Sequence, residues 1–485
     1  MRRFLLFTTL MLVVATIDAQ PQLTLDSCRT LALRNNKQIE IARKNINVAC
    51  YERKVAFSNY LPKISLSGLY LHNNEQVSIL GEQQKNTIQN LGTGVQNGIG
   101  ELLQKTAVTF PQLSEPIKLL SNIDIATPIN SIGASIVDAL TLDTRNIYIG
   151  ALSLTQPIFT GGEIVAYNKI AHYSEIISRN ALNLTIQETI LAIDEAYWQI
   201  VSLSNKLRLT NSFVLLIEKL CSDVDKMVKQ GVATKADLLA VGVRVNEAQI
   251  AQLQVENGLS LARMLLCQIC GIPIDSNLTL ADEECKEIPI PTNNLGEHQF
   301  NIHNRDEIKN LELASKIYRQ KRKIVRSEYL PRLALTANYI FSNPSVTNGF
   351  QNKFRGIWNV GLELKIPLWN WGEGYFKVKK AKTEEIIARY TLADACEKIE
   401  LQVQSSRQRC REAEKRLLLA QNNIIKAEEN LHNANISFAE GVATSEIVLE
   451  AQTAWLQAHS AKIDAQIDVI LTNLNLKKSL GILRP

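Results

Sequence analysis

The chain has 485 residues, of which 46% are apolar and 21% charged, and its formal net charge is +5. Such a small positive excess over this length gives no electrostatic reason to expect a nucleic-acid partner. Glycine and proline number only 22 and 13, which favours long helices over many short strands joined by turns.

The first residues have the pattern of an export signal. Arg2 and Arg3 precede an apolar run over 4–17, and Ala19 supplies the small residue before a cleavage site. These features together define a secretory signal peptide. We therefore predict a signal peptide over 1–19 and a mature chain that starts near Gln20. No later run of 18 apolar residues occurs, so the sequence predicts no transmembrane helix.

The remaining chain contains an internal repeat. The Tyr-Leu-Pro motif of segment 59–63 returns in segment 328–332 at an offset of 269, and Gly-Val-Ala-Thr at 231–234 returns unchanged at 441–444 at an offset of 210. The first offset is 59 residues larger, so the first repeat carries extra chain, which lies within segment 73–146. The sequence thus predicts two structural repeats.

Two segments without glycine or proline dominate the repeats, and they cover 163–230 and 375–440. Each would measure roughly 100 Å as a helix at 1.5 Å per residue. From Ile193 to Val228 and from Val403 to Phe438, small and apolar residues recur at alternating steps of three and four. This period indicates coiled-coil packing.

The full set of expected elements follows from these patterns. We predict repeat 1 over 20–271, an equatorial connection over 272–303 and repeat 2 over 304–485. The expected helices cover 27–59, 163–230, 235–270, 304–328, 375–440 and 445–480. The expected strands cover 63–72, 147–156, 332–341 and 357–366, and the insertion covers 73–146, with short helices near 101–103 and 117–120.

The strand segments alternate apolar and polar residues over about ten positions. This is the length and pattern of a tilted strand that crosses an outer membrane, although a half-buried sheet in a soluble domain alternates in the same way. Four strands cannot close a barrel, so several copies would have to share one. Aromatic residues cluster where strand meets helix and would form an interfacial belt with outer-membrane lipid. They are Tyr60, Phe159, Tyr329, Trp369 and Trp371.

These duplicated motifs, together with Gln156-Pro157-Ile158-Phe159 after a strand, resemble the TolC-like outer membrane efflux protein family. The resemblance implies a mostly helical α+β membrane protein: a homotrimer with a shared 12-stranded β-barrel and a periplasmic coiled-coil barrel of long helices. It implies a passive exit channel of a tripartite efflux or type I secretion system in the Gram-negative outer membrane, and no enzyme. The implied partners are a periplasmic adaptor and an inner-membrane pump, and no cofactor or metal is expected.

The resemblance also implies roles for the two helical turns at the periplasmic tip. These turns would dock the adaptor, and they comprise Gly231, Val232, Ala233, Thr234, Gly441, Val442, Ala443 and Thr444. The candidate entrance gate is Asp237, Glu450 and Phe438. The alternative for the two acids is a solvated position in the first turns of a helix, where the helix dipole favours negative charge.

Other function classes fit the sequence less well. A periplasmic adaptor has one helical hairpin, whereas this chain predicts two, and a soluble coiled-coil scaffold would lack the strands. Cys267-x-x-Cys270 has no second cysteine pair at zinc-site spacing, and we interpret Cys28 as an ordinary cysteine, not a lipid anchor. The insertion over 73–146 is either an enlarged extracellular loop that covers the exit or a mobile loop. The exported substrate, and which adaptor and pump serve it, do not follow from the residues.

Overall fold

The computed structural model describes residues 22–109, 122–274, 278–285, 300–345 and 352–483, with residues 116, 118, 120, 276, 288 and 289. The predicted signal peptide over 1–19 lies outside these residues. The chain divides into two compact units, and each draws on both sequence repeats. Unit 1 comprises Met1–Lys54, Asn168–Arg322 and Lys379–Pro485, and unit 2 comprises Val55–Tyr167 and Lys323–Val378.

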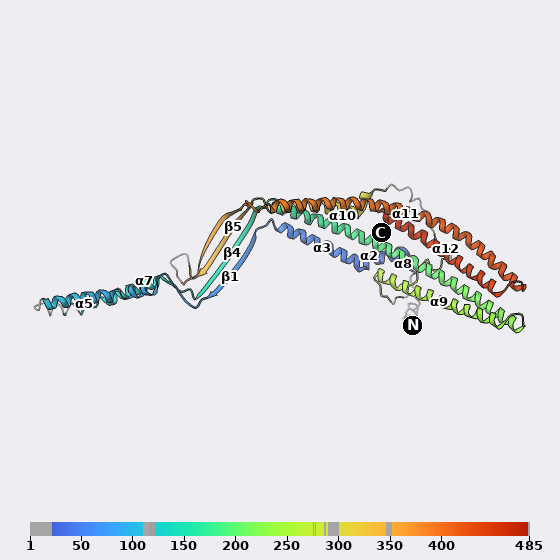
Figure 1. Ribbon diagram of the computed structural model, residues 1–485, viewed down its shortest axis with the longest axis horizontal. Coiled ribbons are helices and arrows are strands. Elements are labelled where there is room, and N and C mark those ends of the chain that lie inside the picture. The colour runs from blue at the N-terminus through green and yellow to red at the C-terminus, as the bar shows by residue number, and fades with distance from the viewer. Residues whose placement is uncertain are drawn as a thin grey trace, which may run out of the picture. The chain divides into compact units, whose positions relative to one another are not determined.

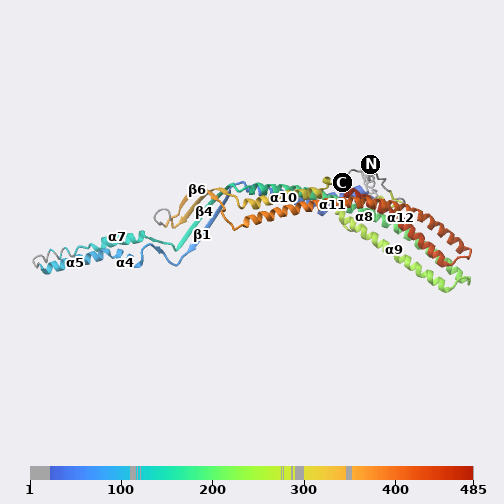
Figure 2. The ribbon, with the colours of Figure 1, turned by 45° about the horizontal axis from the view of Figure 1, so that its top comes forward.

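Long helices form unit 1 (Figure 1). The helices are α2 (Leu25–Asn35), α3 (Lys37–Ser58), α8 (Glu163–Lys229), α9 (Lys235–Cys270), η3 (Ile302–Asn304), α10 (Asp306–Ser327), α11 (Glu373–Ala439) and α12 (Ser445–Ser479). Helices α8 and α9 form one hairpin, and α11 and α12 form a second hairpin beside it in both views (Figures 1 and 2).

The coiled-coil seams form the cores of these hairpins. Ile193, Ile200 and Ile217 of α8 are at most 2% exposed, and they lie in clusters that include residues of α9 and α12. In α11, Val403 and Cys410 are 2% and 7% exposed at the positions equivalent to Ile193 and Ile200. Burial of these small and apolar side chains supplies the main stabilisation of helices this long.

The helix expected over 27–59 is instead two helices, α2 and α3, separated at Asn36. Asn36 has an extended backbone, and its side-chain oxygen accepts hydrogen bonds from the amides of Gln38 at 2.8 Å and Ile39 at 3.4 Å. It thus caps the start of α3, while the nitrogen of its side-chain amide donates to Ile269 O at 2.9 Å. Asparagine competes with the helical backbone in this way, which a periodicity argument does not detect.

A four-stranded antiparallel sheet lies in unit 2, and its strands run side by side (Figure 2). The strands are β1 (Lys63–His72), β4 (Asn146–Phe159), β5 (Arg332–Asn343) and β6 (Arg355–Lys365), in the spatial order β1-β4-β5-β6. Strand β4 is four residues longer than the expected segment 147–156, and its pairing shifts between Pro157 and Phe159. Proline lacks the amide proton that a regular ladder requires.

The register gives the sheet one apolar face. Residues directly opposite each other point to the same side, and one such row joins Leu66, Leu152, Tyr339 and Trp358. The neighbouring row on the other side is polar. It joins Ser65, Ser153, Asn338 and Asn359. Leu66 is 72% exposed and Trp358 is 74% exposed, so this row of the apolar face stays largely uncovered by the described residues.

The insertion forms a small helical bundle in unit 2, where the sequence predicts only short helices. It contains β2 (Val77–Ser78), α4 (Glu82–Gln89), α5 (Leu91–Thr109), α7 (Ala126–Ala139) and β3 (Thr141–Leu142). The short helix expected near 101–103 is part of the 19-residue α5, and of the one expected near 117–120 only residues 118 and 120 are described. Gly133 permits this packing, because a Cβ there would lie 2.1 Å from Ile88 O.

Among the residues that the structure describes, no helix is both long and apolar enough to cross a membrane. The same residues contain no group of three or more histidine, cysteine or acidic side chains that could hold a metal ion.

Candidate functional site: the hairpin tips and the sheet

The two tip turns have the same backbone conformation. Gly231 and Gly441 have φ values of 78° and 75°, and no atom lies within 4 Å of where a Cβ would stand on either. Glycine is therefore needed for the left-handed backbone and not for space. Val232 N donates to Met227 O, and Val442 N donates to Ser437 O, both at 2.9 Å. This closes the first helix of each hairpin with the same C-terminal motif.

The starts of the returning helices differ between the two tips. The hydroxyl of Thr234 accepts from Asp237 N at 3.2 Å, and the Asp237 carboxylate accepts from Thr234 N at 2.9 Å and from its hydroxyl at 2.7 Å. This is a reciprocal capping box. Thr444 has no side-chain cap bond, and Ile447, which occupies the place of the acid, cannot supply the reciprocal bond of a capping box. Only the first tip is held by side-chain hydrogen bonds of this kind.

The candidate gate residues lie near the tips, in different settings. Hydrogen bonds from the Thr234 side chain and backbone lower the pKa of Asp237, so its carboxylate is ionised at neutral pH. Glu450 is exposed on α12. Phe438 is half-buried and packs against the cluster that contains Val448. A local capping role thus accounts for Asp237 within one subunit, and its gating role stays a prediction.

A groove of about 620 Å³ separates the ends of the two hairpins. Its lining includes Val232 from the first tip, Gly441 from the second and Phe438 from α11. Gln452 of α12 also lines it and is 3% exposed, and its side-chain oxygen has no hydrogen-bond partner among the described residues. A buried acceptor without a donor is costly, which marks this wall of the groove as incomplete in the isolated chain.

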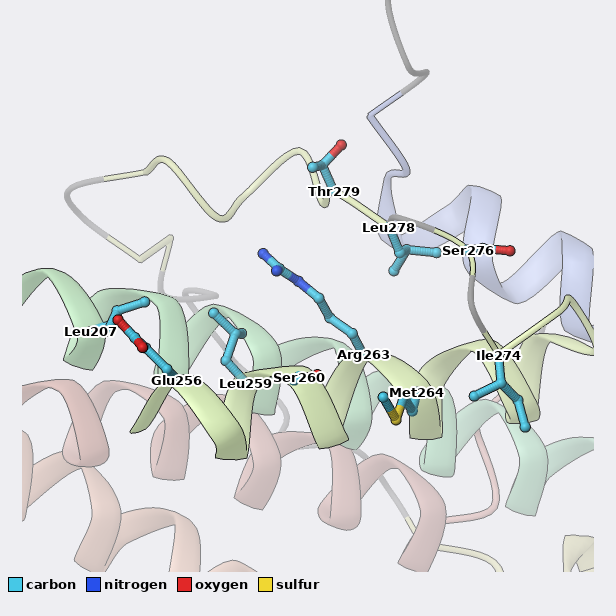
Figure 3. Close-up of a pocket in the computed structure, with 10 residues that line it drawn as sticks. All are labelled: Leu207, Glu256, Leu259, Ser260, Arg263, Met264, Ile274, Ser276, Leu278 and Thr279. Carbon is cyan, nitrogen blue, oxygen red and sulfur yellow. The ribbon is translucent and has the colours of Figure 1, made fainter. Parts of the chain in front are cut away.

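A second pocket, also of about 620 Å³, lies between α9 and the start of the equatorial connection (Figure 3). Arg263 extends from α9 toward this space, and its guanidinium pairs with Glu283 at 2.6 Å. The rest of the lining mixes apolar side chains with hydroxyls, such as Leu259 and Ser260. Among the described residues of the lining there is neither a cysteine nor a histidine.

Each repeat contains a buried glutamate that contacts two arginines, which the sequence patterns did not reveal. Glu175 is 5% exposed; it accepts from Arg179 at 2.8 Å and lies 2.9 Å from Arg53. The three residues of the second set have the same arrangement: Glu385 is 3% exposed, with Arg389 at 2.7 Å and Arg322 at 2.9 Å. The repeat offsets could have identified these sets from the sequence. The two glutamates are 210 residues apart and Arg53 and Arg322 are 269 apart, which are the two offsets of the repeat motifs.

The aromatic residues predicted for the membrane interface all lie at strand–helix junctions of unit 2. Four are exposed, and the values reach 73% for Trp369 and 89% for Trp371. Tyr329 is half-buried, because its ring covers Gly374, where a Cβ would lie 2.8 Å from the ring. Trp371 has a φ of 50°, a left-handed value that is rare for a bulky residue.

Two helical hairpins with matching tips, each preceded along the chain by two strands of an antiparallel sheet with an exposed apolar face, define a subunit of an outer-membrane exit channel. The profile of the family described as "Outer membrane efflux protein" matches residues 130–271 and 301–482. The chain belongs to this family.

Individual relatives agree with this assignment. The alkaline protease secretion protein AprF of Pseudomonas aeruginosa is 21% identical over 338 residues, which covers 69% of this chain and 70% of AprF. The outer membrane protein TolC of Vibrio cholerae is 21% identical over 307 residues, which covers 62% of this chain and 69% of that TolC. The crystal structure of VceC from Vibrio cholerae has a TM-score of 0.68 at 14% identity and covers 94% of this chain and 96% of VceC.

These findings confirm the predicted family, fold class and general function. The protein is an outer-membrane exit channel of the efflux and secretion type, with a periplasmic extension. Its family consists of channels, and related members work with adaptor proteins and inner-membrane pumps.

Proposed function

We propose that three copies of this chain assemble into one conduit, in which β6 of each copy pairs with β1 of the next. The observation that supports this is the pair of free edges on an antiparallel sheet. Strand β1 pairs only with β4, and β6 pairs only with β5, among the described strands. An exposed strand edge is a template for pairing with another chain.

The strand directions suit a closed ring. Strands alternate in direction across the order β1-β4-β5-β6, so β1 and β6 run in opposite directions. A β6–β1 contact between copies therefore continues the antiparallel pattern. Such a head-to-tail contact closes into a ring when its rotation permits. In that ring the apolar row of Leu66 and Trp358 would face lipid, and the row of Ser65 and Asn359 would face the lumen.

Cysteine cross-linking across the free edges tests this assembly. In Ser65→Cys/Asn359→Cys, mild oxidation of outer membranes is expected to produce covalent dimers and trimers. The control is Ser153→Cys/Asn338→Cys, whose paired positions lie within one sheet and are expected to link only within the chain. Residues of β6 and of the next copy's β1 can pair in more than one register. Ser67→Cys/Asn359→Cys is therefore tested beside Ser65→Cys/Asn359→Cys. Monomers alone from every edge pair would refute the β6–β1 contact.

The groove between the hairpin tips is the proposed docking site for the adaptor. It is apolar at Val232 and Phe438, and the unpartnered oxygen of Gln452 offers an acceptor to a donor on the partner. Val232 and Val442 are 68% and 81% exposed at the tips. Apolar groups that stay exposed next to a groove are typical of an interaction surface.

Adaptor capture tests this site. Val232→Arg and Val442→Arg are expected to abolish co-purification of the adaptor that accompanies the wild-type protein, while the trimer persists. Val243→Arg is the matched control, since Val243 is 56% exposed on α9 and does not line the groove. Unchanged adaptor recovery in both tip variants would move the docking site elsewhere.

A further inference from the structure

Three cysteines from distant segments gather in the main core of unit 1. Cys28 lies in α2, and Cys267 and Cys270 lie one turn apart at the end of α9. All three are 0% exposed and belong to the same cluster. The Cys-x-x-Cys pattern of α9 therefore acquires a third thiol through the fold, and the channel function makes no use of it.

The two thiols of α9 have different neighbours. The sulfur of Cys270 donates to Cys28 O at 3.7 Å. The sulfur of Cys267 instead lies 4.0 Å from Ser276 O. The geometry thus pairs Cys28 with Cys270.

The ends of the two helices are fixed against each other independently of the thiols. Gly271 has a φ of 68°, and a Cβ there would lie 2.8 Å from the Cβ of Asn35. The side chain of Asn36 also donates to Ile269 O at 2.9 Å. These contacts hold α2 beside the last turn of α9, so Cys270 stays next to Cys28 without a covalent bond.

We propose that Cys28 and Cys270 form a disulfide in the exported protein. The periplasm is an oxidising compartment in which neighbouring thiols are converted to disulfides. Each thiol loses its proton and one electron, and the new S–S bond joins the sulfurs. The two electrons and two protons reduce a periplasmic protein disulfide of the thiol-oxidase class to two thiols, through a mixed disulfide.

Both thiols are buried in the folded chain, so the oxidant must reach them before α2 has docked on α9. The thiolate is the reactive form, and at that stage either cysteine can attack the oxidant while the other resolves the mixed disulfide.

Mass spectrometry of the protein purified from outer membranes without reductant tests the bond. The protein is unfolded in an alkylating reagent, digested and fragmented so that Cys270 is distinguished from Cys267 and Cys285. We expect the Cys28 peptide to be recovered linked to Cys270. Cys410 is the matched control, because it is 7% exposed and its sulfur contacts Asn473, and it is expected to be fully alkylated. Alkylated Cys28 and Cys270, an acylated Cys28 or a link to another cysteine would each refute the proposal.

Thermal unfolding supplies a second measurement. A reductant is expected to lower the Tm of the wild-type protein, since the cross-link constrains the long segment between the two residues. It should leave the Tm of Cys28→Ser/Cys270→Ser unchanged, and Cys410→Ser should respond as the wild type does. Equal responses of wild type and double variant would refute the bond, and neither readout depends on how copies pair or on the adaptor.

Discussion

Glu175 and Glu385 stand 210 residues apart, and each is buried between an arginine of its own long helix and an arginine of a shorter helix. Arg53 of α3 reaches Glu175 on α8, and Arg322 of α10 reaches Glu385 on α11. The two ion sets thus join equivalent helices of the two repeats. A buried carboxylate is tolerated only when it is paired, so these contacts fix which short helix lies on which long one.

Removal of one buried charge is expected to destabilise the helical unit. Glu385→Gln leaves Arg322 and Arg389 without their acid, and we expect a loss of about 2 kcal/mol in the free energy of unfolding. This is below the cost for a fully buried set, because the side chains of Arg322 and Arg389 are 33% and 66% exposed. Urea unfolding monitored by helical circular dichroism measures the change. Glu384→Gln is the control, since Glu384 is 42% exposed, and its stability should stay near the wild-type value.

The stability of the protein should also depend on the charge of Glu175 at acid pH. The hydrogen bond from Arg179, with the nearby charge of Arg53, lowers the pKa of Glu175 below its ordinary value of 4.5. A lowered folded pKa means that the stabilisation is present above pH 4.5 and is lost as the pH falls through the folded pKa. Glu175→Gln should therefore show a smaller loss of Tm than the wild type as the pH decreases below 4.5. An equal loss in both proteins would contradict this.

The two tip threonines should respond differently to truncation. Thr234→Ala removes the hydroxyl of a complete capping box, and we expect a cost of about 1 kcal/mol in the stability of the first hairpin tip. Thr444→Ala removes a hydroxyl that makes no cap bond, so the second tip should change little. Hydrogen exchange of the first amides of α9 and α12 measures each tip separately. Similar protection losses at the two tips would contradict the asymmetry.

Trp371 and Gly161 occupy equivalent junctions of the two repeats. Replacing each by the residue of the other should have opposite effects on folding. Trp371→Gly relieves a left-handed φ of 50° and removes an 89% exposed ring, so the fold should persist while membrane anchoring weakens. Gly161→Trp should prevent folding, since a Cβ there already lies 3.0 Å from Leu330 Cβ and Ser327 O. Extraction of each variant from outer membranes by mild detergent, with its Tm, distinguishes the two effects.

The proposed gate makes a prediction about ion selectivity. Asp237 and Glu450 contribute two carboxylates per subunit, so a trimer would place six around its axis and favour cations. Asp237→Asn/Glu450→Gln should therefore reduce the cation preference measured as the reversal potential in planar bilayers. Thr234→Ala serves as the control, because it perturbs the Asp237 cap without removing charge. An unchanged reversal potential in the double variant would assign Asp237 to capping alone.

Much of the hairpin architecture is readable from the sequence because its determinants are local. The absence of glycine and proline over 163–230, the seam that starts at Ile193 and the glycines of the tip turns each act within a few residues of chain. The break at Asn36 escaped this reasoning, since a side chain that caps the next helix leaves the apolar period intact. The helices of the insertion were underestimated for a related reason. Glycines such as Gly133 disfavour a helix locally. The small size of Gly133 is favourable only in the folded chain, where it allows close contact with Ile88.

The sequence by itself determined that this protein is a repeated, coiled-coil chain of the exit-channel family, since period, motif order and offsets depend only on position along the chain. The tertiary structure decided which distant side chains meet. It placed Arg53 beside Glu175 and Cys270 beside Cys28, and it placed Gln452 in the wall of the groove between the tips. Such contacts depend on the packing of separate helices at atomic distances, and no local pattern of residues specifies them.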